Sequence, residues 1–328
     1  MTDRAPAQVL AEAARAARYA PSALNTQPWR WSVGPDGLDL YADRTRQLHA
    51  ADPDGRLLMI SCGVALHHAR VALAAEGWGG SVVRFPGPTD LLARITLDAP
   101  TSVSPEAMRL FQATEARHTD RRPVVDVPVE PAAWDEVVAA ATGEGVNLHR
   151  LTPEQVSDLA SAAAHADALA AADPALRAEL ALWVGGDRPS GAGLPDTVIP
   201  SRPPQTEVPE REFGRGGTLD VGEGHAGAAT YAVLFGDTDD PPAWLRAGEA
   251  LSAAWLTATR LGLAVLPFTA VIEIPATRQT IRRLLAGVGH PYVVLRVGTA
   301  DPDHAGPPHT PRLPAEQVID TSGIDTTG

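Results

Sequence analysis

The chain of 328 residues contains no lysine, so all 27 of its basic residues are arginine. Without lysine the protein can neither form a Schiff base, as pyridoxal phosphate enzymes do, nor build a Walker A phosphate loop. Aspartate and glutamate together number 40, which gives a net charge of −13. This charge argues against nucleic acid as a partner, because such binding needs a basic surface that displaces phosphate counterions.

Cysteine and long apolar runs are also scarce. The single cysteine, Cys62, excludes an internal disulfide and any metal cage built from several thiolates. The most apolar stretch, 261–275, contains Pro267 and Glu273 and is shorter than the roughly 18 residues of a membrane span. Residues 1–20 show no apolar core of a secretory signal. We therefore expect a cytoplasmic protein that does not span a membrane.

The ten histidines show no metal-binding pattern. His67 and His68 are neighbours on one Ala-rich helix and are expected to project in different directions, unlike a metal-binding pair four residues apart. At least one of them is expected in the core or at an interface, and His304 and His309 in the Pro-rich tail are expected to be solvated. We predict no metal site.

Apolar residues make up 44% of the chain and charged residues 20%, which is typical of a globular protein with one large or two medium domains. Within this acidic chain, one segment gathers cations around a hydroxyl: Arg117-His118-Thr119-Asp120-Arg121-Arg122. Guanidinium groups bind phosphate oxygens in pairs of hydrogen bonds, and Thr119 adds a donor. The alternative is a solvated basic run, or ion pairs with the surplus carboxylates.

An internal repeat organises the chain. Segments 63–77 and 248–262 have equal length and share Gly, Ala, Leu, Ala and Gly at matching positions, and each indicates an Ala-rich helix that ends at a glycine. Extended segments precede and follow each helix at matching places: 38–43 and 231–237 before, 91–97 and 292–297 after. The repeat predicts a duplicated α+β unit with mixed or antiparallel sheets flanked by helices.

The two expected halves are 1–110 and 111–328. Between the repeats, Gly186–Gly227 is rich in Gly and Pro and has little periodicity. A loop of this length is either a lid over a site or a disordered connection, and we favour the lid.

The stretch from Ala20 to Trp29, APSALNTQPW, is specific. Pro21, Ser22 and Ala23 form a small-residue turn, and Asn25 can offer a donor and an acceptor to a heteroaromatic edge. A helix end followed by a stiff strand entry would place Trp29 in the core but would not explain Ser22 or Asn25. The stretch resembles a signature loop of the flavin-dependent nitroreductase superfamily.

Two further motifs resemble the same superfamily in the same order. Arg117, His118, Thr119 and Arg121 match the motif that binds the FMN phosphate and ribityl chain and places a cation near the N1–O2 edge of the flavin. Arg312, in Arg312-Leu313-Pro314, matches the C-terminal arginine that closes the phosphate site.

The segment after the second repeat helix resembles the part of these proteins that faces the flavin. The resemblance implies that Pro267, Phe268 and Thr269 lie against the ring, with main-chain amides near N5. Members often have an acidic residue and glycine where this chain has Thr269 and Ala270, and the lysine common beside the C-terminal arginine is absent.

Ordinary members are homodimers with two FMN at the interface, each held by motifs from both subunits. Here the Pro-Ser loop occurs once, in the first half, and the basic motif once, in the second. One chain can therefore build one complete site, a fused pseudo-dimer that resembles the Acg-type branch. We expect a monomer by this fusion or a further homodimer.

The resemblance implies an FMN-binding oxidoreductase that takes electrons from NAD(P)H and reduces a nitroaromatic, a quinone or another small-molecule acceptor through flavin N5, with no catalytic side chain. The alternative is a flavin-storage protein whose lid prevents turnover. A scaffold without flavin fits least, because three arginines aimed at an empty site would repel one another.

Overall fold

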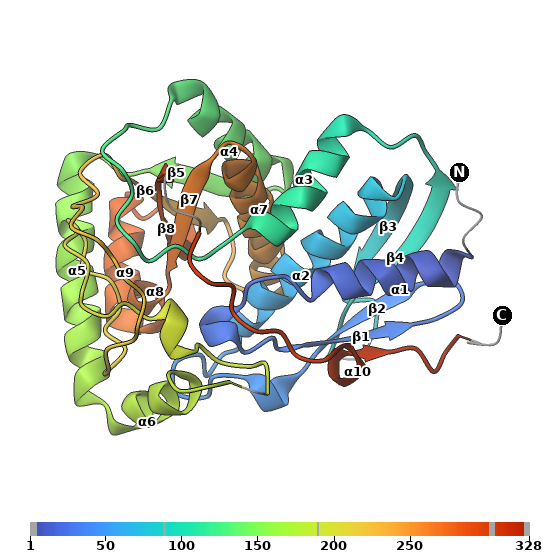
Figure 1. Cartoon of the computed structure of the whole chain (residues 1–328), viewed down its shortest axis with the longest axis horizontal. Coiled ribbons are helices and arrows are strands. Elements are labelled where there is room, and N and C mark those ends of the chain that lie inside the picture. The colour runs from blue at the N-terminus through green and yellow to red at the C-terminus, as the bar shows by residue number, and fades with distance from the viewer. Residues whose placement is uncertain (1–4, 88–89, 189, 302–305, 325–328) are drawn as a thin grey trace.

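The strands form two separate sheets (Figure 1). The computed structural model describes residues 5–87, 90–188, 190–301 and 306–324. The first sheet has the order β3-β4-β2-β1-β9, with Trp78–Arg84, Leu91–Pro100, Leu38–Ala42, Trp29–Val33 and Ile319–Asp320. The second has the order β5-β6-β8-β7, with Asn147–Arg150, Thr230–Gly236, His290–Thr299 and Leu263–Phe268. All neighbours are antiparallel except β1 and β9, so the predicted α+β class with antiparallel and mixed sheets is confirmed.

Helices cover both sheets, and proline starts most of them. Their bounds are α1 Pro6–Ala17, α2 Arg56–Ala75, α3 Pro105–Ala116, α4 Pro131–Gly143, α5 Pro153–Ala172, α6 Pro174–Trp183, α7 Pro241–Arg260, α8 Ala270–Glu273, α9 Pro275–Leu284 and α10 Ala315–Val318. Proline suits the first helical turn because the missing N–H would be unpaired there anyway. Side chains of Ser104, Thr152, Asp173 and Asp240 cap free N–H groups of α3, α5, α6 and α7.

The two sheets share one connectivity. The order β3-β4-β2-β1 in the first sheet corresponds to β7-β8-β6-β5 in the second, and α2 connects β2 to β3 as α7 connects β6 to β7. The predicted strands at 38–43, 91–97, 231–237 and 292–297 are all present, as β2, β4, β6 and β8. Duplication of one unit stays a proposal, which this matching order supports.

Helices α2 and α7 cross in the middle of the molecule (Figure 1) at Gly63 and Gly248. A Cβ on Gly63 would lie 1.9 Å from the carbonyl oxygen of Leu245, and a Cβ on Gly248 would lie 2.0 Å from that of Ile60. Leu245 lies three residues before Gly248, and Ile60 lies three residues before Gly63. The contact is therefore reciprocal, as at an interface with two-fold symmetry. Only glycine allows the two backbones to approach this closely.

The helix ends were predicted better than the helix starts. Gly77 and Gly262 have φ of +79° and +74°, the left-handed conformation of a glycine that follows a helix. The helices begin at Arg56 and Pro241, each seven residues before the glycine at which the repeat begins, so the expected starts at Gly63 and Gly248 are wrong. These two glycines mark the helix crossing instead.

The core between the halves is built around α2. This helix is long and apolar enough to cross a membrane, but 89% of its most apolar window is buried inside the protein. His67 and His68 are buried, and both Nδ1 atoms contact the Ser252 hydroxyl on α7, at 2.8 and 3.0 Å, so the expectation that they diverge is wrong. Burial lowers the pKa of His67 to about 4, so its ring is neutral at pH 7.

The C-terminal arm, residues 306–324, runs from the second sheet to the first (Figure 1, red). Its strand β9 pairs with β1, and Leu313 and Val318 are buried in the large core cluster, which contains residues of both sheets. The Arg18 side chain donates from Nε to the carbonyl oxygen of Leu313 at 3.1 Å. The arm therefore packs with residues 5–110, although the chain enters it from the second half.

We expect Gly63→Ala to lower the melting temperature strongly, because the added methyl group forces α2 and α7 apart. Overpacking of this kind typically costs about 1–3 kcal/mol, and the opposing atom here is backbone that cannot rotate away. The matched control is Gly143→Ala at the end of α4, where an added Cβ meets nothing within 4 Å. Equal melting temperatures for the two variants would contradict the close helix crossing.

Candidate functional site

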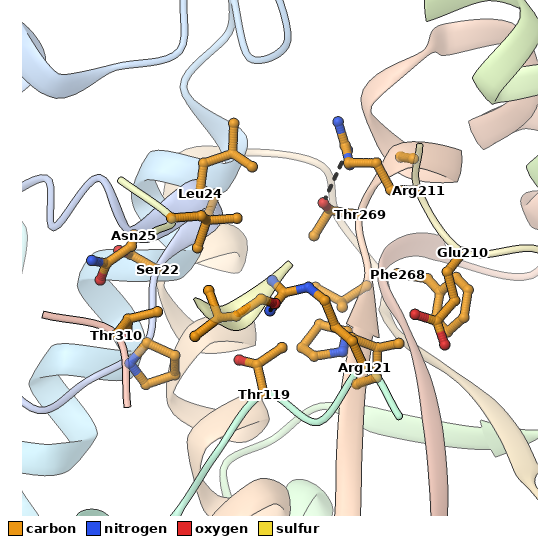
Figure 2. Close-up of a pocket in the computed structure, with 18 of the residues that line it drawn as sticks. Ser22, Leu24, Asn25, Thr119, Arg121, Glu210, Arg211, Phe268, Thr269 and Thr310 are labelled. Atoms are coloured by element: carbon orange, nitrogen blue, oxygen red, sulfur yellow. Dashed lines mark hydrogen bonds between the residues drawn. The ribbon is translucent and has the colours of Figure 1, made fainter. Parts of the chain in front are cut away.

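A pocket is lined by residues from both 1–110 and 111–328 (Figure 2). Eleven of the twelve predicted site residues line it. They are Pro21, Ser22, Ala23, Asn25, Arg117, His118, Thr119, Arg121, Pro267, Phe268 and Thr269. Ser22, Leu24 and Asn25 of the first half stand on one side, and Phe268 and Glu210 stand on the opposite side. Segments far apart in the sequence thus meet at one cavity.

The loop after α1 carries strained backbone. Leu24, Asn25 and Gln27 have φ of 46°, 56° and 50°, values that residues other than glycine rarely adopt. The Ser22 hydroxyl accepts from the main-chain N–H of Gln27 at 2.9 Å and helps to hold this shape. Strain of this kind persists only where the surroundings enforce it, and it concentrates at functional sites.

The Asn25 side chain is already hydrogen-bonded within the protein. Its amide nitrogen donates to the carbonyl oxygens of Gly193 and Pro311, each at 3.0 Å. The expectation that this amide donates to a heteroaromatic ring is therefore wrong for the nitrogen. The side chain instead joins the loop to the Gly186–Gly227 segment and to the C-terminal arm.

Arg117, the residue that ends α3, is a buried cation with unused donors. It is 4% exposed, and its guanidinium lies 4.6 Å from the ring centre of Trp255. Among the described residues, neither Nε nor Nη1 has a hydrogen-bond partner. Burial and the nearby Arg312 lower the pKa of Arg117 to about 9, so it is still charged at pH 7. Such a group fits an anion, because an unpaired buried charge is costly.

His118 and His309 stack beside this cation, with ring centroids 3.9 Å apart. His309 is exposed, as expected, although its ring packs on the basic motif, and His304 lies outside the described residues. Burial, then His309 and Arg117, lower the pKa of His118 to about 4, and burial also lowers the pKa of His309. Both rings are therefore neutral at pH 7.

Arg312, the twelfth predicted residue, does not line the pocket. Its guanidinium donates to the carbonyl oxygens of Tyr19 at 2.9 Å and Thr310 at 2.8 Å, and burial lowers its pKa to about 10. It therefore fastens the C-terminal arm to the end of α1. Its charge nonetheless reaches the site, because it lowers the pKa of Arg117.

Arg121 lines the opposite part of the pocket. Its Nη1 donates to the carbonyl oxygen of Val198 at 3.2 Å, and its guanidinium lies 5.4 Å from the ring centre of Phe213. Burial lowers its pKa to about 10, and Glu210 opposes this shift. Arg117 and Arg121 thus provide two separate cations in the pocket wall.

The Gly186–Gly227 segment forms part of the pocket wall. The structure describes this segment except for residue 189. Leu194, Val198 and Phe213 line the pocket and form a small apolar cluster with Leu24. Nearby, Arg211 makes an ion pair with Glu273 of α8 and a 3.4 Å hydrogen bond to Thr269 (Figure 2). The segment therefore contacts both halves at the pocket, and its role as a lid is a proposal.

Several pocket residues were not found from the sequence. They are Leu24, Ser61, Asp167, Glu210, Arg211, Phe213 and Trp255. Most lie in the aperiodic segment or on the inner faces of helices, where no motif marks them. Burial raises the pKa of Asp167 to about 6, so this carboxyl titrates near neutral pH.

In the part of the chain that the structure describes, no group of three His, Cys, Asp or Glu residues could hold a metal ion.

Gln27 fixes the segment and the arm at once. Its amide nitrogen donates to the carbonyl oxygen of Gly191 at 2.7 Å, and its amide oxygen accepts from the main-chain N–H of Leu313 at 3.0 Å. The side chain is buried, so each lost bond leaves a buried polar group unpaired. Gln27 therefore joins the loop after α1 to both the Gly186–Gly227 segment and the C-terminal arm.

We expect Gln27→Leu to release the segment and the arm, and therefore to speed proteolytic cleavage within 186–227 several-fold at 25 °C. The measurement is the rate of limited proteolysis followed by mass spectrometry. Gln8→Leu, at an exposed position of α1, is the control for the substitution itself. If both variants are cut at the parent rate, Gln27 does not hold the segment.

Comparison with known proteins gives relatives over nearly the whole chain. No family model matches. The chain is 41% identical over 307 residues to "Putative NAD(P)H nitroreductase Rv3131" of Mycobacterium tuberculosis (strain ATCC 25618 / H37Rv), which spans 92% of this chain and 88% of that protein. It is 33% identical over 329 residues to "Putative NAD(P)H nitroreductase acg" of the same strain, with 97% of each chain covered.

Two solved structures are also similar. The FMN and NADPH-dependent nitroreductase NfnB from Sphigopyxis sp. strain HMH is 18% identical, with a TM-score of 0.42, and the match covers 66% of this chain and 99% of that chain. Nitroreductase A from Vibrio parahaemolyticus RIMD 2210633 is 14% identical, with a TM-score of 0.39 and coverage of 67% and 78%.

The full-length sequence relatives confirm the assignment to the nitroreductases and to their Acg-type branch, and with it the assignment to the oxidoreductases. The chain belongs to the NAD(P)H nitroreductase family that includes Acg.

Proposed function

We propose that the protein binds FMN in the pocket between its halves and uses it as an NAD(P)H-dependent oxidoreductase. The observation that carries the proposal is Arg117, a buried cation with two donors that lack a partner among the described residues, in the wall of a cavity. A phosphate group would pair with these donors, so the residues present fit the anionic end of FMN. When bound, FMN supplies the exchange of two electrons between NAD(P)H and an acceptor.

The other pocket residues have complementary tasks in this proposal. Thr119, beside Arg117, adds a hydroxyl donor for the phosphate, and Arg121 provides the cation for the pyrimidine edge of the ring. Pro267 has no N–H, so the main-chain donors expected near N5 reduce to Phe268 and Thr269. No side chain acts as a nucleophile.

The proposal predicts one FMN per chain, because the Pro-Ser loop and the basic motif each occur once and meet at one pocket. The absorbance of the purified protein, compared with its concentration from amino-acid analysis, gives this ratio. Two FMN per chain, or FAD in place of FMN, would contradict the fused pseudo-dimer.

A storage protein with little turnover is the second candidate. It is favoured by the way the Gly186–Gly227 segment is fixed over the pocket by Arg211, Asn25 and Gln27. The two candidates differ in whether a nicotinamide can reach the ring. Nitroaromatics, quinones and other small acceptors are equally open under the first candidate.

Anaerobic mixing with NADPH or NADH separates the two candidates. We expect rapid loss of the yellow flavin absorbance, because the family members are named for NAD(P)H. The stopped-flow rate at 450 nm is the measurement, and the comparison of the two nucleotides shows which one the protein prefers. Absorbance that persists with both nucleotides, in protein that dithionite still reduces, would favour storage.

We expect Arg117→Gln to weaken FMN binding by at least about tenfold, since a hydrogen bond to a charged group contributes roughly 1.5–3 kcal/mol. Fluorescence titration of apoprotein with FMN measures the change. The matched control is Arg122→Gln in the same motif, because Arg122 pairs with Asp120 at 2.8 Å and does not line the pocket. If both variants bind FMN as the parent does, the phosphate assignment is wrong.

A further inference from the structure

Arg296 fixes the main chain on both sides of Arg121. It lies in β8 and is 1% exposed. Its Nη2 donates to the carbonyl oxygen of Asp120 at 3.0 Å and to that of Arg122 at 2.6 Å. A guanidinium that binds both flanking carbonyls leaves the peptide units around Arg121 little freedom to rotate. The direction in which Arg121 enters the pocket therefore depends on Arg296.

Glu210 completes this arrangement from the Gly186–Gly227 segment. Its carboxylate makes an ion pair with Nη1 of Arg296, and the two side chains are 7% and 1% exposed. Glu210 and Arg121 both line the pocket. Burial raises the pKa of Glu210, whereas the charges of Arg296 and Arg121 oppose this shift and favour the carboxylate. One buried carboxylate thus stands between two arginines, one structural and one in the pocket wall.

The neighbouring charges are paired elsewhere. Asp120 forms a 2.8 Å ion pair with Arg122, and Arg211 pairs with Glu273. Glu210 is therefore the carboxylate that pairs with Arg296 and also offsets the charge of Arg121, to which Asp120 makes a smaller contribution. Without it, two buried cations would act on the same part of the pocket, where low polarity strengthens their field.

We propose that Glu210 and Arg296 are positioning residues that set, through Arg121, how strongly the pocket stabilises the negative charge of reduced FMN. This inference rests on the proposed function. A cation beside the ring favours the anionic reduced form over the neutral oxidised form, and Glu210 cancels part of that preference. The Gly186–Gly227 segment, which forms part of the pocket wall, thereby also adjusts the reduction potential of the cofactor.

The test is the midpoint potential of bound FMN, measured by dye-coupled reduction at pH 7. Glu210→Gln keeps the shape of the side chain and removes its charge, so the potential is expected to rise. A tenfold tightening of reduced over oxidised FMN corresponds to about 30 mV for a two-electron couple. The matched control is Asp196→Asn, which removes a carboxylate of the same segment that pairs with Arg215 and does not line the pocket. Its potential is expected to equal that of the parent.

A double-mutant cycle tests whether the effect passes through Arg121. Arg121→Gln alone is expected to lower the potential, and Glu210→Gln is expected to change it much less in that background than in the parent. A Glu210→Gln potential at or below the parent value, or a shift of equal size in both backgrounds, overturns the inference. If Glu210→Gln does not fold, Arg121→Gln decides, and an unchanged potential there is the contrary result.

FMN binding by the parent protein tests the proposed function, and the midpoint potential tests the further inference. Parent apoprotein that does not bind FMN in a fluorescence titration refutes the assignment of the pocket. Parent protein that binds FMN, with variants that bind it equally well but do not shift its potential, refutes only the roles of Glu210 and Arg296.

Discussion

The close crossing of α2 and α7 at Gly63 and Gly248 is the constraint on which the pocket depends. Leu57, Ile60, Ser61 and Val64 of α2 line the cavity, and so do Leu251 and Trp255 of α7. Because two glycines leave no room for adjustment, the distance between these walls is fixed by backbone contact rather than by flexible side chains. The loop of the first half and the basic motif of the second are thereby held on opposite sides of one cavity.

The buried arginines differ in whether a carboxylate pairs with them. Arg296, Arg211 and Arg122 are each paired with a carboxylate, which offsets the cost of burial. Arg117 is different, since two of its buried donors have no partner among the described residues. Because the chain has no lysine, every basic side chain is an arginine. The arginines therefore differ in the partners that their guanidinium groups contact. In the proposed function, the phosphate group binds at these unpaired donors of Arg117.

Local chemistry could be predicted from the sequence, and long-range pairing could not. The glycines that end α2 and α7 follow from rules that act within a few positions. The motif residues at the pocket were predicted from the resemblance of short segments to a known family. Glu210 and Arg296 are 86 residues apart, and no pattern in the sequence marks either of them. The assumed helix starts were wrong because glycine at a helix crossing looks, in sequence, like glycine at a helix boundary.

The hydrogen bonds of Asn25 join residues that the ribosome adds at very different times. The partners at Gly193 and Pro311 follow it by 168 and 286 positions. The first sheet also receives its edge strand β9 from Ile319 and Asp320. During synthesis, the polar groups of the loop that begins the pocket are therefore satisfied only after residues 311–320 have been added. A chain that lacks the arm leaves the side chains of Asn25 and Gln27 without their partners at Pro311 and Leu313.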